Sequence, residues 1–316
     1  MATGACDGRE SLMLPASLST RDGVGPSCIS LPALPAGAWP RVIDFLAHRF
    51  PSISSDEIAA RMRCGDIIDE HGLLVSPERC YQAHLKLYYY RSIPDEVRIP
   101  FEEEILFRDA YLIAVDKPHF LPVTPGGRYL QETLLVRLKR KLGIDALAPM
   151  HRIDRETAGL VLFTIQPSTR GRYQNLFSQR AVVKHYQALA PFRADIKFPM
   201  TDRSRLMGAE HFMRMREAEG EPNAETVIEV LEKKDGCARY RLSPLTGKKH
   251  QLRVHMAALG IPILNDQIYP RYLSKAEIVA DDYSKPLQLL AEQISFTDPV
   301  TGQERCFESR RFLNAL

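Results

Sequence analysis

The stretch HRIDRETAGLVLF, residues 151–163, contains two arginines and two carboxylates within six residues and then becomes apolar. The run from Ala158 to Phe163 has no polar alternation, which predicts a strand buried on both faces or nearly so. Asp154 lies between Arg152 and Arg155, and a neighbouring positive charge favours the ionised form of a carboxyl. The stretch therefore predicts a buried strand with a charged carboxylate just before it, which is either structural or a reagent.

The segments around this strand alternate between strand and helix patterns. Residues 104–118 read as two strands around Arg108 and Asp109, and residues 131–143 read as an amphipathic helix closed by Gly143. Residues 158–165 are followed by a helix that Ser168 is expected to cap, and residues 181–190 form another strand. Residues 248–260 show helical spacing again. This mixture predicts an α+β fold with a mostly antiparallel mixed sheet flanked by helices.

The chain is expected to have three parts. Residues 1–40 are rich in Gly, Pro, Ser and Ala without a sustained period, which indicates a flexible, disordered arm. Residues 41–95 begin with helical patterns, including a capping box at Ser54 and Glu57, and form a small module. Residues 96–316 form the large domain that carries the opening stretch.

Composition limits the class of protein. The chain has 316 residues, of which 45% are hydrophobic and 26% charged, as is typical of globular proteins. It has no apolar run of the roughly 18–20 residues that span a membrane and no secretory leader pattern, so we expect a cytoplasmic protein. The six cysteines are scattered, which speaks against a disulfide framework and a zinc site.

The net charge of +3 is small, but basic residues are concentrated in two segments. No acidic residue lies between Glu156 and Asp195 or between Asp235 and Asp266, while Lys and Arg recur in both segments. The two segments together are expected either to form one positive surface for a polyanion or to be ordinary solvated faces. Motifs of nucleotide hydrolysis, serine hydrolases and zinc proteases are missing.

Four ordered stretches resemble the RluA family of pseudouridine synthases. HRIDRETAGL resembles the family signature H-R-L-D-x-x-T-S-G-L, with Ile153 and Ala158 as departures. LIAVDKPHFLPVTPGG resembles its lysine-proline strand and loop, and VVKHYQALA resembles its K-x-Y strand. PLTGKKHQLRVHMAALGIPILND resembles its T-G-R-T-H-Q-I-R-V-H block, with Lys248 and Lys249 replacing Arg and Thr. The resemblance extends over about residues 105–300.

The resemblance implies site-specific isomerisation of uridine to pseudouridine in structured RNA, either rRNA or tRNA, with a target base flipped out of its stack. The family needs neither a cofactor nor a metal, and no membrane partner is implied. We further expect a monomer. Residues 41–95 resemble the S4 RNA-binding domain that often precedes this catalytic domain.

Family roles are carried over position by position. Asp154 resembles the catalytic aspartate, which attacks either the ribose C1′ or the uracil ring. Arg253 resembles the arginine that pairs with it, and Tyr186 resembles the tyrosine that stacks on uracil and is suited to assisting proton removal. The expected substrate-binding residues are Arg152, which fills the gap left by the flipped base, together with Lys184, Lys117, Lys248 and His250.

Other interpretations remain open. Arg152 and Arg155 also suit ordinary surface ion pairs, Tyr186 a core aromatic, and His151 and His250 structural hydrogen bonds. A non-catalytic RNA-binding protein that keeps the fold is the main alternative function. A sugar hydrolase that uses Asp154 is a third possibility, although no second carboxylate stands in a matching block. The segment 193–226 gives no clear pattern.

Overall fold

The computed structural model describes residues 20–33, 38–91, 93, 96–211, 213–272 and 282–314. The chain divides into two compact units, Met1–Asp95 and Glu96–Leu316. Each unit has its own hydrophobic core. Among the described residues, no helix combines the length and apolar character needed to cross a bilayer.

The first unit packs two short helices against a small antiparallel sheet of strand order β1-β3-β2. The elements are β1 (Ser27–Ser30), α1 (Val42–Arg49), α2 (Ser55–Arg63), β2 (Ile67–Asp69) and β3 (Lys86–Tyr89). The Ser54 side chain accepts a hydrogen bond from the Glu57 backbone N–H, so the expected start of α2 is confirmed. Its core is formed by Val42, Leu46, Met62 and their neighbours.

The expected flexible arm over residues 1–40 is wrong for part of its length. Residues Ser27–Ser30 form β1, which pairs with β3, and Leu31 is fully buried. The rest of that prediction, residues 1–19 and 34–37, lies outside the described residues. A four-residue strand whose partner follows about sixty residues later leaves no local period, so composition alone suggested an arm.

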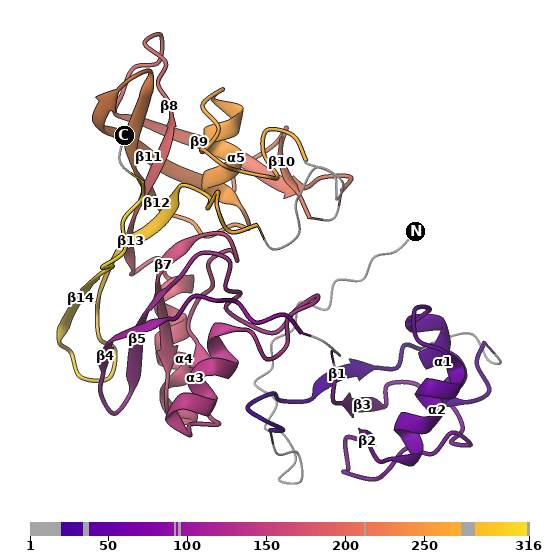
Figure 1. Ribbon diagram of the computed structural model, residues 1–316. Helices are drawn as coiled ribbons and strands as arrows, with labels where there is room; N and C mark the ends of the chain where they lie inside the picture. Colours follow the sequence, from indigo (N-terminus) through magenta and orange to yellow (C-terminus); the bar gives the residue numbers. More distant parts are fainter. Residues whose placement is uncertain are drawn as a thin grey trace. The chain divides into compact units, whose positions relative to one another are not determined.

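The second unit is built on one long sheet of eleven strands with three helices (Figure 1). Its elements are β4 (Glu104–Arg108), β5 (Leu112–Lys117), α3 (Leu134–Leu142), β6 (Ala148–Pro149), β7 (Ala158–Thr164), α4 (Pro167–Ser178), β8 (Val183–Pro191), β9 (Met200–Gly208), β10 (Met215–Ala218), β11 (Ala224–Lys234), β12 (Cys237–Pro244), α5 (Gln251–Ala258), β13 (Leu289–Thr297) and β14 (Glu304–Glu308).

The strand order along the sheet is β10-β9-β11-β12-β8-β13-β7-β5-β4, with β14 on β13 and β6 on β7. All pairings are antiparallel except the short parallel contact between β13 and β7. The predicted α+β class with a mostly antiparallel sheet is confirmed. The segment 193–226, which gave no pattern, forms β9, β10 and the start of β11.

Strand β7 is buried along its whole length because helices cover both of its faces. Val161 and Phe163 belong to the core that contains α3, whereas Leu160 and Leu162 belong to the core that contains Tyr173 of α4. Successive residues of a strand point to opposite faces, so a strand between two helices is apolar throughout. Helix α4 begins at Pro167, so the expected cap at Ser168 is wrong. Proline fits the first helical position, where its missing N–H removes no bond.

Helix α5 covers the other half of the sheet. Its Leu252 and Met256 pack with Ala188 of β8, Ile228 of β11 and Tyr240 of β12. Figure 1 shows α5 beside these strands and α3 and α4 beside β4, β5 and β7. The half covered by α5 meets the half covered by α3 and α4 at the neighbouring strands β8, β13 and β7, which we call the junction. Strand β7 is the apolar part of the opening stretch.

Gly159 allows β7 and β13 to approach closely at the junction. Its φ is +107°, and a Cβ atom built there would lie 2.2 Å from the Ala291 carbonyl oxygen. Ala291 is its parallel partner on β13. Only glycine avoids both the strained backbone angle and the clash with backbone atoms.

We expect Gly159→Ala to lower the free energy of unfolding by about 3 kcal/mol or more, from backbone strain and overpacking together. Thermal unfolding of the full chain measures the change. Gly171→Ala is the control, because Gly171 lies in α4 with no atom within 4 Å of its added Cβ. That variant should be as stable as the wild type or slightly more stable. Equal melting temperatures for all three proteins would contradict the close approach.

Candidate active site

The turn that carries Asp154 lies between β6 and β7. The Thr157 backbone N–H donates a 3.2 Å hydrogen bond to the Asp154 carbonyl, which closes the turn directly before the buried strand. The Asp154 side chain keeps 25% exposure. It is therefore held by the fold and still open to solvent.

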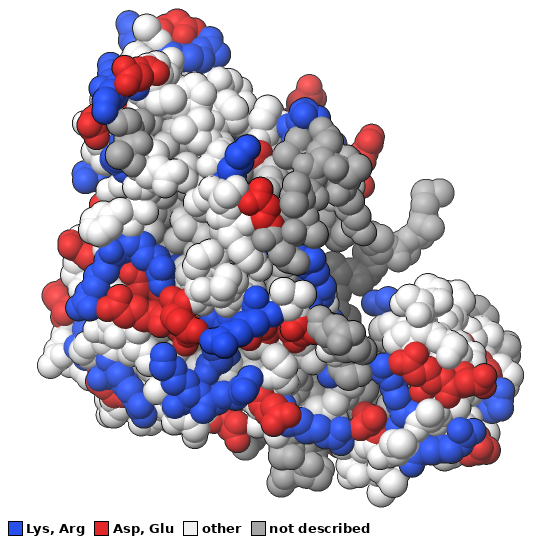
Figure 2. All heavy atoms as spheres, viewed as in Figure 1, with Lys and Arg blue, Asp and Glu red and all other residues white. Residues whose placement is uncertain are grey.

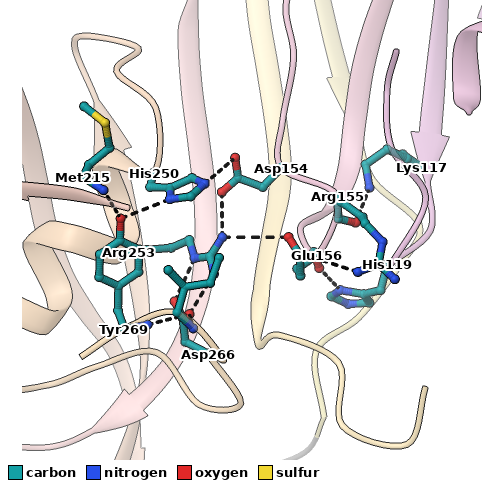
Figure 3. Close-up of polar contacts among 11 residues, drawn as sticks. Lys117, His119, Asp154, Arg155, Glu156, Met215, His250, Arg253, Asp266 and Tyr269 are labelled. Atoms are coloured by element: carbon teal, nitrogen blue, oxygen red, sulfur yellow. Dashed lines mark hydrogen bonds and ion pairs between the residues drawn. The ribbon is translucent and has the colours of Figure 1, made fainter. Parts of the chain in front are cut away.

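Arg253 of α5 lies between two carboxylates (Figure 3). Its side chain is only 1% exposed, and its Nη1 donates a 3.0 Å hydrogen bond to Asp154 Oδ2. On its other side, Nε and Nη2 donate to the two oxygens of Asp266 at 2.8 and 2.7 Å. The structure thus brings Asp154 and Arg253 together across 99 positions of sequence. The geometry is a bidentate pair with Asp266 and a single hydrogen bond to Asp154.

Asp266 is the site residue that the sequence interpretation missed. Its carboxylate is 1% exposed and also accepts hydrogen bonds from the backbone N–H groups of Ile268 and Tyr269, at 2.8 and 3.0 Å. One signal was available: Asp266 ends the long acid-free segment in which Arg253 lies. A buried arginine needs a carboxylate partner, and the next acid along the chain was the natural candidate.

The pKa of Asp154 is lowered below its ordinary value. Burial alone would raise the pKa, but the charges of His250 and Arg253 and the Arg253 hydrogen bond outweigh it. Burial in turn lowers the pKa of His250, so its ring is largely neutral at pH 7. Arg253, which contributes both a charge and a hydrogen bond, is therefore the permanently charged partner of Asp154.

His250 lies beside the pair at the start of α5. Its Nε2 is 3.8 Å from Asp154 Oδ1, and its Nδ1 lies 3.0 Å from the Tyr269 hydroxyl. That hydroxyl also accepts a 2.7 Å hydrogen bond from the Met215 backbone N–H. The Tyr269 hydroxyl is free to donate its proton to Nδ1, an arrangement in which the neutral ring carries its own proton on Nε2, toward Asp154.

Tyr186 and Lys184 lie on β8, next to the junction. Burial, with the charge of Asp154 as a smaller cause, raises the pKa of Tyr186, so its phenol keeps its proton at neutral pH. Tyr186 pairs with Ala291 of β13, and Ala291 also pairs with Gly159 of β7, the strand that follows the Asp154 turn. Lys184 Nζ donates a 3.4 Å hydrogen bond to the Thr246 carbonyl, and burial lowers its pKa.

Arg152 and Lys248 have exposed side chains, as expected of residues that meet a large substrate. His151 instead accepts a 3.2 Å hydrogen bond from the Leu162 backbone N–H and stacks on Phe177. Burial lowers the pKa of His151 to about 3, so it is a neutral structural residue.

Lys117 does not lie where a substrate contact would. Its side chain is fully buried, and its Nζ donates to the carbonyls of Pro118 and Arg155 at 2.9 and 3.1 Å. The expected substrate-binding role is wrong for this geometry. Lys117 is the last residue of β5, and its side chain points into the protein toward the Asp154 turn, away from solvent.

Charges on the surface of the second unit are mixed. On the face seen in Figure 2, Lys and Arg side chains alternate with bands of Asp and Glu. Basic and acidic side chains are therefore interleaved on this face.

One group of possible metal ligands occurs among the described residues: Asp202, Glu217 and His255, whose ligand atoms lie within 4.8 Å of one another. The two ring nitrogens of His255 lie 3.0 and 3.1 Å from the hydroxyls of Thr226 and Ser204. Both ring nitrogens of His255 are thus within hydrogen-bonding distance of hydroxyls, so we assign the group a structural role.

The buried amine of Lys117 predicts a pH-dependent stability. Burial lowers its pKa to about 7, which the charges of Glu156 and Asp154 offset only in part. An unfolded lysine titrates near 10.4, so between these values the unfolded chain binds a proton that the folded chain has released. The stability of the wild type relative to Lys117→Met should therefore rise from pH 7 to pH 9, by up to about 1.4 kcal/mol per pH unit.

Urea unfolding of both proteins at several pH values measures this difference. Lys197→Met, which alters an exposed lysine, is the control and should give a curve parallel to that of the wild type. Parallel curves for Lys117→Met as well would show that the amine titrates as an ordinary lysine.

Known proteins are similar to this chain in sequence and in fold. Residues 111–258 match the RNA pseudouridylate synthase family model. The chain is 31% identical over 210 residues to the dual-specificity RNA pseudouridine synthase RluA of Haemophilus influenzae, covering 66% of this chain and 92% of that protein. The protein of the same name from Pasteurella multocida is 32% identical over 215 residues, covering 65% and 92%.

A solved structure of human RNA pseudouridylate synthase domain containing 1 has a TM-score of 0.53 and 23% identity, covering 66% of this chain and 84% of that chain. It supports the fold. The near-complete coverage of the bacterial relatives favours an enzyme over a non-catalytic RNA-binding protein. The chain belongs to the RluA family of RNA pseudouridine synthases, which isomerise uridine to pseudouridine in RNA.

Proposed function

We propose that Asp154 is the catalytic carboxylate of this synthase. The observation that carries the proposal is the 3.0 Å hydrogen bond between Arg253 and an Asp154 side chain that is held ionised yet remains partly exposed. An ionised, oriented carboxylate can attack either the ribose C1′ or the uracil ring and divide one difficult step into two. The reaction breaks the C1′–N1 bond and forms a C1′–C5 bond, while C5 loses a proton and N1 gains one.

Arg253 in this proposal keeps Asp154 charged and aimed, and Asp266 in turn fixes Arg253. Two nitrogens of the guanidinium are held by Asp266, so the third has little freedom other than to meet Asp154. Such pre-organisation lowers the cost of reaching the reactive geometry. Asp266 is therefore a positioning residue for the catalytic pair.

Tyr186 is proposed to stack on the flipped uracil. Its raised pKa keeps the phenol protonated at neutral pH, which favours stacking and hydrogen-bond donation over removal of a proton. Arg152, which is exposed two residues before Asp154, is proposed to fill the gap that the base leaves. Lys184 and the exposed Lys248 are proposed contacts for RNA phosphates, and His250 for the substrate beside Asp154.

The proposed substrate is a loop or stem-loop of rRNA or tRNA, whose bases can be splayed out as a paired A-form stem does not allow. The two bacterial relatives are named dual-specificity synthases, which supports more than one RNA target. We propose an S4-like RNA-binding role for the first unit. We also propose that the protein acts as a monomer in the cytoplasm.

Asp154→Asn should abolish pseudouridine formation, with a loss of at least about 10³-fold in the rate constant and little change in RNA affinity. Mapping pseudouridine across total RNA in strains with and without the gene identifies the target site. Complementation with wild type should restore that site, and complementation with Asp154→Asn should not. Equal restoration by both proteins would refute the catalytic assignment.

Asp266→Asn should lower the single-turnover rate constant roughly 10- to 100-fold, because a loosened Arg253 no longer aims Asp154. Release of tritium from RNA labelled at uridine C5 measures the rate, with enzyme in excess so that partial unfolding does not change the rate constant. Asp195→Asn, which alters an exposed Asp–Arg pair, is the matched control. An unchanged rate constant in Asp266→Asn would remove Asp266 from the catalytic arrangement.

A further inference from the structure

The Asp154 turn is held on the side opposite to Arg253 as well. Figure 3 shows the Asp154 and Glu156 side chains directed toward Arg253, whereas Lys117 and His119 lie on the other side of the turn. His119 Nδ1 lies 2.6 Å from the Glu156 carbonyl oxygen, and Lys117 Nζ lies 3.1 Å from the Arg155 carbonyl oxygen. Two consecutive carbonyls directly after Asp154 are thus bound by side chains at the end of β5.

The protonation of His119 follows from its partner. A carbonyl oxygen only accepts hydrogen bonds, so Nδ1 of His119 must donate. Burial lowers the pKa of His119 to about 4, so at neutral pH the ring is the neutral tautomer with its proton on Nδ1. In that tautomer Nε2 carries no proton and can only accept. The only N–H group of the neutral His119 ring therefore donates to the Glu156 carbonyl oxygen.

The backbone beside His119 adopts an unusual conformation to make this contact. Phe120 has a φ of +68°, a left-handed angle that is rare for a bulky residue. Its ring is buried, stacked against Phe101 at 6.1 Å and edge-on to Tyr283 at 5.1 Å, and the Arg155 guanidinium lies 5.9 Å from the ring centre. This packing keeps the strained residue in place and so fixes the direction of the neighbouring His119.

We propose that His119 is a positioning residue for the reaction, which holds the backbone of the Asp154 turn so that the carboxylate keeps its alignment with Arg253 and the reacting ribose. This inference rests on the proposed role of Asp154. The turn is held from both sides: the Arg253 guanidinium fixes the carboxylate end, and His119 with Lys117 fixes the backbone end. A shift of about 1 Å in a reacting group costs up to about 100-fold in rate, so loss of one anchor should appear in the chemical step.

His119→Leu removes the donor and keeps an apolar side chain in the pocket. We expect its single-turnover rate constant, at saturating enzyme, to fall about 10-fold or more, with the apparent Kd for RNA within 2-fold of the wild type. His119→Asn should recover most of the rate, because the asparagine amide nitrogen stands at the position of Nδ1 and can donate to the same carbonyl. Gln174→Leu, which alters an exposed side chain of α4 in the second unit, is the control and should match the wild type.

The outcomes separate positioning from mere folding. A purely structural role would reduce the fraction of active enzyme but leave the saturated rate constant unchanged, and the inference would then be wrong. Failure of His119→Asn to exceed His119→Leu in rate would also overturn it. If Asp154→Asn kept full activity, the proposed function itself would fail; if Asp154→Asn is inactive and His119→Leu is fully active, only the inference fails.

Discussion

The buried guanidinium of Arg253 is the interaction on which the rest of the site depends. Removing a cation from water is costly unless carboxylates and hydrogen bonds compensate for the lost hydration. Asp266 accepts two hydrogen bonds and Asp154 accepts one, so each of the three guanidinium nitrogens donates to a carboxylate. Because Arg253 lies in the first turn of α5 and Asp154 precedes β7, the ion pair also fixes these two elements against each other.

The sheet supports this arrangement at one point in particular. The short parallel contact between β7 and β13 joins the half of the unit covered by α5 to the half covered by α3 and α4. Gly159 lets the two backbones meet there, five residues after Asp154. The stretch 151–163 thus provides both the Asp154 carboxylate and the glycine that lets β7 pack against β13. This explains why the charged residues stand directly before the apolar strand.

The local patterns were read correctly where the physical cause is local. The apolar run of β7, the Ser54 cap and the Gly143 stop each follow from periodicity or from one hydrogen bond within a few residues. The errors arose where a distant partner decides the outcome. Strand β1 forms by pairing with the distant strand β3. The buried amine of Lys117 is stabilised by hydrogen bonds to two carbonyls, one of them in the Asp154 turn. Composition and residue spacing do not indicate which distant residues will become partners.

The sequence by itself determined the α+β class, the strand that follows Asp154, and the pairing of this carboxylate with Arg253 through resemblance to a family. Only the tertiary structure decided that Asp266 holds Arg253, that Lys117 faces inward, and that His119 binds the Glu156 carbonyl. The physical reason is that secondary structure depends on neighbours within a few residues, whereas the ionisation and aim of a buried group depend on whatever the fold places within about 4 Å of it.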